Sequence, residues 1–384
     1  MPRRQGNSPD LLHTARQRFA RLLDTPLHVV ARKLESLLAE TSSSGNTHDQ
    51  AGFTILHEYI IQLVDNLPQT FQARFNFDAA MIKAVEGDWS PNLRFSNMMI
   101  PRHQEQWGHQ RLVMPSEDRT NAHVIDLIHL RGRDSLEDID LLSYPLLIHE
   151  LGHYILLQHD QRFIPSFGEE LQQSISQLRL AGIADRGAAR TKAQKTVDEI
   201  KRLWTPTPDQ HNWSHELTID LIALWTCGPA YLDCFLDIID HADLNPYQIT
   251  KSHPPYAIRA SALVRGAAIV GLTDYAKKLA ALQETWRSSR WRRFLGNRYV
   301  TLARQELVDA CINLAFSFCT SLGLAQCTRE QIVSVRARPL DHRPIDVGLD
   351  LILWAWSVFD QYGSHAYDRW QSAVVKDVSA EIMQ

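Results

Sequence analysis

Two histidines and a glutamate interrupt an otherwise apolar stretch of the sequence, and they constrain the fold more than any other feature. The stretch covers residues 145–157 and reads PLLIHELGHYILL, with His149, Glu150 and His153 as its ionisable residues. Apolar flanks of this kind bury a helix in a core, whereas buried ionisable groups are costly unless partners satisfy them. The fold therefore has to bring a metal ion or opposite charges to this helix.

The spacing of the two histidines favours a shared metal ion. On an α-helix, residues four apart differ by about 40° around the axis and about 6 Å along it, so His149 and His153 project from one face. Imidazole nitrogens bind zinc at about 2.0–2.1 Å, and two of them define one edge of a tetrahedron. Glu150 is rotated by about 100° from His149 and can reach a water on that zinc, where it can act as a general base.

A catalytic zinc takes a third protein ligand, and the nearest downstream candidates are weak. His159 follows His153 by six residues. If the helix continues, His159 lies about 240° around the axis and about 9 Å along it from His153, which is out of reach. Glu169 and Glu170 lie close downstream of the motif, but neither is followed by Asp one helical turn later. They stay as minor alternatives.

Glu216 is the favoured third ligand. It lies in the segment HELTID at 215–220, and Asp220 follows it by one helical turn on the same face. The next five residues, LIALW, are apolar, so these carboxylates lead into a buried helix and need a partner. A carboxylate at Asp220 can accept the N–H of a liganding histidine and thereby orient its ring.

Three segments together resemble the gluzincin metallopeptidases. They are HELGH at 149–153, the E-x-x-x-D pattern at 216–220, and SHPP at 252–255 followed by Arg259. Their order and spacing are similar to the CAAX prenyl endopeptidase kind and its soluble bacterial relatives, over roughly residues 140–265.

The resemblance implies roles for the residues of these segments. His149, His153 and Glu216 would be zinc ligands, Glu150 the general base, and Asp220 the partner behind a liganding histidine. His253 or Arg259 would stabilise the oxyanion, although HPP at 253–255 is equally typical of a helix start. The membrane members have transmembrane helices and this sequence has no such segment, so a prenylated substrate is not implied.

Composition limits the partners and the compartment. The chain of 384 residues is 44% hydrophobic and 22% charged, with a net charge of −4, which disfavours binding of nucleic acid through overall charge. Its five cysteines form no C-x-x-C pair, which favours reduced thiols and a cytoplasmic location. The longest nearly apolar run, 221–239, contains two aspartates and a Gly-Pro break, so no membrane partner is expected.

The pattern along the chain predicts a mainly α protein with a small β-sheet, an α+β class with a zincin-like catalytic core and helical extensions at both ends. Helices are expected at 8–40 and 48–67 and from 142 onward, and strands at Arg94–Ile100, Arg111–Met114 and His123–Leu130. The expected domains are a helical region at 1–90, a metallopeptidase domain at 91–275 with a helical insertion at 160–212, and a helical region at 276–384.

Residues 286–299 alternate arginines with aromatic residues. Such a pattern can bind an anionic partner, but it is interpreted here as a solvated helix face whose aromatic side chains reach the core.

Two functions are open on this sequence. One is a zinc-dependent peptidase acting on a protein or peptide, with one zinc per chain. The other is a zinc-binding scaffold with little or no proteolytic activity. Glu150 favours the peptidase, because a purely structural zinc site needs no general base. A deformylase is excluded, because its cysteine ligand precedes the motif and no cysteine precedes Cys227.

Overall fold

The computed structural model describes Met81 and eleven further segments of the chain. These are residues 97–104, 108–115, 122–131, 139–158, 160–183, 188–206, 212–242, 245–251, 253–294, 296–342 and 348–382. The helices expected at 8–40 and 48–67 lie outside the described residues. The chain divides into two compact units, one of Asp140–Gln371 and one of Met1–Ile139 with Ser372–Gln384. The domain limits expected from the sequence, 1–90, 91–275 and 276–384, stay a prediction.

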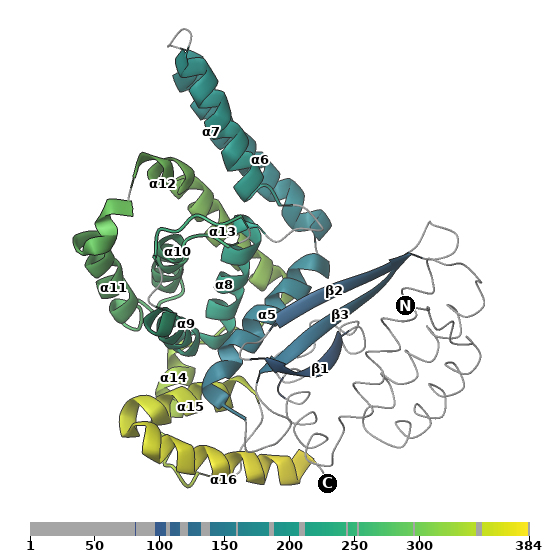
Figure 1. Ribbon diagram of the computed structural model, residues 1–384. Helices are drawn as coiled ribbons and strands as arrows, with labels where there is room; N and C mark the ends of the chain where they lie inside the picture. Colours follow the sequence, from purple (N-terminus) through teal and green to yellow (C-terminus); the bar gives the residue numbers. More distant parts are fainter. Residues whose placement is uncertain are drawn as a thin grey trace, which may run out of the picture. The chain divides into compact units, whose positions relative to one another are not determined.

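The unit that contains the N-terminus carries a three-stranded sheet (Figure 1). Its strands are β1 (Asn97–Gln104), β2 (Gly108–Pro115) and β3 (Ala122–Arg131), in the order β1-β3-β2. The central strand β3 pairs in parallel with β1 and antiparallel with β2. Each of the three strand segments expected from the sequence overlaps one of these strands.

The unit Asp140–Gln371 is built from helices. In chain order these are η3 (Leu141–Ser143), α5 (Tyr144–Gln158), α6 (Asp160–Ile183), α7 (Ala188–Trp204), α8 (Trp213–Cys227), α9 (Pro229–Ala242), α10 (Tyr256–Ile269), α11 (Lys277–Ser288), η4 (Arg290–Phe294), α12 (Asn297–Leu302), α13 (Gln305–Leu322), α14 (Arg329–Arg336), α15 (Leu349–Tyr362) and the start of α16 (Ser364–Ile382).

The expected α+β class with a zincin-like core is therefore wrong. The described residues are mainly helical, and those between Asp140 and Gln371 contain no strand. Periodicity detects the local strand pattern at 97–131, but it does not say which part of the chain those strands join. Here they belong to the unit that lacks the 149–153 motif, so they form no sheet within the unit that carries the motif.

Helix α8 is the centre of the helical unit. It packs against α5, α10 and α13, and all of its residues except Trp225 are buried. It begins at an Asn212 cap, whose side-chain oxygen accepts hydrogen bonds from the N–H groups of Ser214 and His215. It ends at Gly228, whose φ of 54° is a left-handed conformation that favours glycine. Pro229 then starts α9, as is typical of a first helical position.

Helices α6 and α7 lie side by side as a long hairpin within the range expected to be an insertion (Figure 1). Its base is packed into the unit: Phe163, Phe167 and Trp204 are buried there. The indole N–H of Trp204 donates to the carbonyl of Leu302, 2.9 Å away, which joins α7 to the end of α12.

Candidate metal centre

Two helices supply the candidate ligands, and they approach each other closely. Helix α5 carries His149 and His153, and α8 carries Glu216. At their contact, a Cβ added to Gly152 would lie only 2.8 Å from the Cγ2 of Ile219. Glycine between the two histidines therefore lets the backbones of α5 and α8 come near enough to share ligands.

The structure brings together His149, His153 and Glu216, the three ligands expected from the sequence. One ligand atom of each lies within 4.8 Å of the other two, and all three residues are buried. The Nε2 of His149 is 3.6 Å from Oε2 of Glu216, and the Nε2 of His153 is 3.5 Å from its Oε1. The two imidazole rings are nearly perpendicular, with centroids 5.2 Å apart.

This donor set fits a metal ion. Oε2 of Glu216 is buried and has no hydrogen-bond partner within the described part of the chain. An unsatisfied buried acceptor of this kind costs about 1–3 kcal/mol, and more when it is charged. Two imidazoles and one carboxylate are also a ligand set of catalytic zinc sites. The buried group could therefore bind a metal ion.

Asp220 lies directly behind His149. It is fully buried, and its Oδ1 is 3.1 Å from Nδ1 of His149. A carboxylate in this position accepts the Nδ1–H, which directs Nε2 toward Glu216 and reserves it as the atom that can bind a metal. This is the geometry that the role expected for Asp220 requires.

Arg259 forms an ion pair with Asp220. Its Nε donates to Oδ2 of Asp220 at 2.7 Å, and its Nη2 donates to Oδ1 at 2.6 Å. The guanidinium also lies 5.1 Å from the centroid of the Phe235 ring. In the structure, Arg259 therefore holds the carboxylate that holds His149, whereas the resemblance implied a role at the oxyanion.

Tyr231, on α9, is a site residue that the sequence reasoning missed. Its hydroxyl donates to Oδ1 of Asp220 and lies 3.2 Å from Nδ1 of His149. Its ring is nearly parallel to that of His149, with centroids 6.3 Å apart. The available signal was the Gly-Pro break at 228–229, which predicts a turn between two apolar helices, and a buried tyrosine just after it needs a partner for its hydroxyl.

His253 approaches the group from the loop before α10. Its Nε2 is 3.7 Å from Oε1 of Glu216, and its side chain is 58% exposed. Thr250 fixes the loop, since its hydroxyl donates to the carbonyl of His253 at 2.6 Å. The two prolines at 254–255 lead directly into α10, so the segment is a helix start and also brings an imidazole to the ligand group.

The remaining candidates are elsewhere. Glu169 and Glu170 are exposed on α6 and do not belong to the group of three ligands. His159 lies outside the described residues. Glu150 follows His149 on α5 and is partly exposed.

Charges in the group balance one another in the metal-free protein. Burial lowers the pKa of His149, but the nearby carboxylates of Asp220 and Glu216 outweigh this and raise it to about 10. Burial raises the pKa of Glu216, but the charges of His153 and His149 lower it well below its usual range. The pKa of Asp220 is also lowered, because the Arg259 charge and hydrogen bond outweigh burial.

Comparison with known proteins adds no relative. No protein-family model matches the sequence, and neither a curated protein nor a solved structure matches it significantly. Within the described ranges, no helix combines the length and apolar composition that a membrane crossing requires.

Proposed function

We propose that this protein is a zinc-dependent peptidase of the gluzincin type, in which His149, His153 and Glu216 hold one zinc ion. The observation that supports this most is the buried oxygen of Glu216, which lacks a hydrogen-bond partner between two histidines. Zinc fits a site of two imidazoles and a carboxylate, and it would satisfy that oxygen. When bound, zinc supplies a Lewis acid that lowers the pKa of water and polarises a carbonyl.

Residues around the zinc ligands would transfer protons and orient His149. Glu150, partly exposed beside His149, takes the proton from the attacking water and passes it to the leaving amine. Asp220 keeps the Nδ1 of His149 protonated, so Nε2 stays available as a ligand. Arg259 and Tyr231 hold Asp220 from two further directions.

His253 would serve the substrate. It is the exposed member of the group, at 58%, and it lies on the same side as Oε1 of Glu216. A protonated or N–H-bearing imidazole there donates to the carbonyl oxygen as negative charge develops on it. We therefore assign oxyanion stabilisation to His253 and not to Arg259.

Two measurements test the proposal. Metal analysis of the purified full chain should find one zinc per chain, and a His149→Ala/His153→Ala variant should contain none. N-terminal proteomics of a cell extract should reveal new protein N-termini after incubation with wild type and not with Glu150→Gln. Glu169→Gln, which changes an exposed glutamate on α6, should behave as wild type.

The results of these two measurements distinguish a zinc peptidase from a zinc-binding scaffold without proteolytic activity. Glu150→Gln should keep its zinc and lose at least about a hundredfold in turnover, since an amide cannot take a proton at neutral pH. Zinc in both proteins and no new N-termini in either would favour the scaffold. Full zinc in the double histidine variant would exclude the ligand assignment itself.

A further inference from the structure

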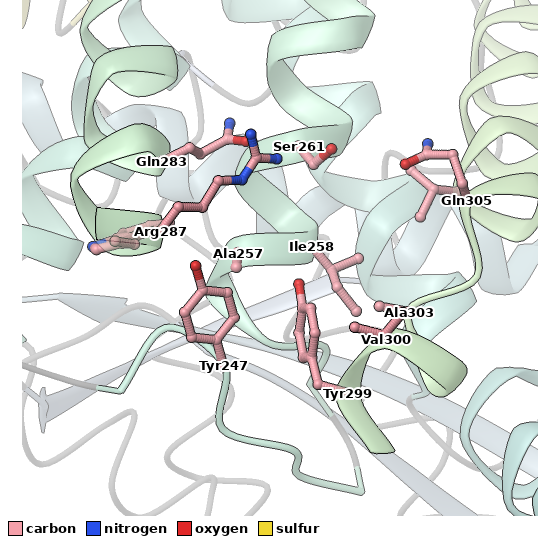
Figure 2. A pocket seen from close by; sticks show the side chains of 12 residues that line it. Tyr247, Ala257, Ile258, Ser261, Gln283, Arg287, Tyr299, Val300, Ala303 and Gln305 are labelled. Carbon is pink, nitrogen blue, oxygen red and sulfur yellow. The ribbon is translucent and has the colours of Figure 1, made fainter. Parts of the chain in front are cut away.

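A cavity apart from the metal centre is lined by α10, α11, α12, the start of α13 and the loop before α10 (Figure 2). Its volume is about 200 Å³. A cavity of about 150 Å³ is enough to hold benzene, so this one has room for a single ring with a small substituent.

Three aromatic side chains contribute to the walls of the cavity. Tyr247 and Tyr299 meet edge to face with centroids 5.0 Å apart, and Trp286 is buried in the lining. Burial raises the pKa of both tyrosines, so their hydroxyls stay neutral at physiological pH and can donate hydrogen bonds. Walls of this kind accept a planar ring in stacked or edge-to-face contact.

Hydrogen-bond donors converge on one side of the cavity. Nε2 of Gln283 is buried and has no hydrogen-bond partner within the described part of the chain. The guanidinium of Arg287 lies beside that amide, and the hydroxyls of Tyr247 and Tyr299 point toward the two of them (Figure 2). Arg287 is 58% exposed and donates through Nη1 to Glu284 at 2.6 Å, so its other nitrogens stay available as donors.

We infer that this cavity is a binding site for a small aromatic carboxylate. The ring would lie against Tyr247, Tyr299 and Trp286, and the carboxylate would accept from the Gln283 amide and the Arg287 guanidinium. A carboxylate fits better than a neutral acceptor because one of the two donors carries a positive charge. The alternation of arginines and aromatic residues at 286–299 thus contributes both a wall and a charged donor to one site.

The test uses benzoate as the probe, with the full chain and isothermal titration calorimetry. Benzoate should bind with one site per chain. Benzamide, which keeps the ring and loses the charge, should bind at least about fivefold more weakly, and acetate, which lacks the ring, should not bind measurably.

Two variants locate the binding. Gln283→Leu keeps the size of the side chain and removes the amide, and it should weaken benzoate binding about tenfold. Arg287→Gln removes the charge of an exposed side chain, and it should weaken binding at least about tenfold. Gln361→Leu makes the same change as the first variant at an exposed position near the end of α15 and should bind as wild type.

Three results would overturn the inference. They are the absence of benzoate binding to wild type, equal binding of benzamide and benzoate, and unchanged binding in folded Gln283→Leu and Arg287→Gln. Zinc content measured on the same samples keeps this test independent of the metal centre, because neither substitution touches a candidate ligand.

Discussion

Asp220 and Arg259 are 39 residues apart in the sequence and form a two-pronged ion pair behind His149, with N–O distances of 2.7 and 2.6 Å. The pair is almost completely enclosed, since the side chain of Arg259 is 13% exposed and that of Asp220 is 0% exposed. Buried pairs of this kind are weak contributors to stability, but breaking one is costly because a charge is left without a partner. Because the pair lies behind a candidate ligand, we propose that it orients the His149 ring.

Replacing Asp220 should therefore weaken zinc binding. We expect Asp220→Asn to lower zinc affinity about 10–100-fold, because the amide holds the His149 ring less well and presents no negative charge to it. Titration against a competing chelator measures this. Asp309→Asn is the matched control, since that carboxylate pairs with Arg265 on the surface. Equal zinc affinity in Asp220→Asn and wild type would remove Asp220 from the site.

Tyr231→Phe should have a smaller effect in the same direction. The change removes one donor to Asp220 and leaves the ring beside His149 in place. A single hydrogen bond is worth about 1 kcal/mol, so zinc affinity should fall about fivefold with little change in fold. Tyr367→Phe removes a hydroxyl that bonds to Asp140 instead, and it should leave zinc affinity unchanged. A loss as large in Tyr367→Phe would mean that the effect is general destabilisation.

Gly152→Ala should destabilise the protein although alanine favours helices. The new Cβ would press on Ile219, and crowding of this kind in a packed core costs about 1–3 kcal/mol, against a propensity gain of about 1 kcal/mol. Gly168→Ala on α6 is the control, because its added Cβ meets no atom within 4 Å. That variant should be more stable than wild type by about 0.5–1 kcal/mol. Equal denaturant midpoints for the two variants would contradict the close approach of α5 and α8.

Zinc binding should release protons. The pKa of His149, raised to about 10 in the metal-free protein, means that zinc displaces a proton from this group at neutral pH. Zinc affinity should therefore rise with pH up to about 10. Calorimetry in buffers of different ionisation enthalpy at pH 7.5 should find at least about one proton released per zinc. A value of zero would mean that His149 is already neutral.

The same raised pKa sets the sign of a stability effect in the metal-free chain. Protonated His149 contributes stability fully below its unfolded value of 6.5 and loses that contribution as pH rises through about 10. Unfolding of the metal-free protein should thus become easier across this range. His149→Gln should show a weaker pH dependence there.

The sequence was sufficient to predict those residue pairs of the candidate site that lie on one helix. His149 and His153 share a helix face, and so do Glu216 and Asp220, so spacing alone places each pair. Tyr231 and the position of Arg259 depend on how α9 and α10 fold back over α8, which no local pattern encodes. The fold class was predicted wrongly for a similar reason. The strand patterns at 97–131 can be recognised locally, but the compact unit to which the strands belong depends on contacts between distant residues.

The near-complete burial of α8 has a consequence for how this site can change in evolution. Glu216 and Asp220 lie in a helix whose neighbours are almost all apolar, so each carboxylate is tolerated only while its partners remain. A descendant that lost its histidines would keep two unpaired buried charges and would gain stability by replacing both acids with apolar residues. If the candidate metal site were lost, the two histidines, the two acids and Arg259 should therefore be replaced together. Exposed residues of α6 can be replaced independently of one another.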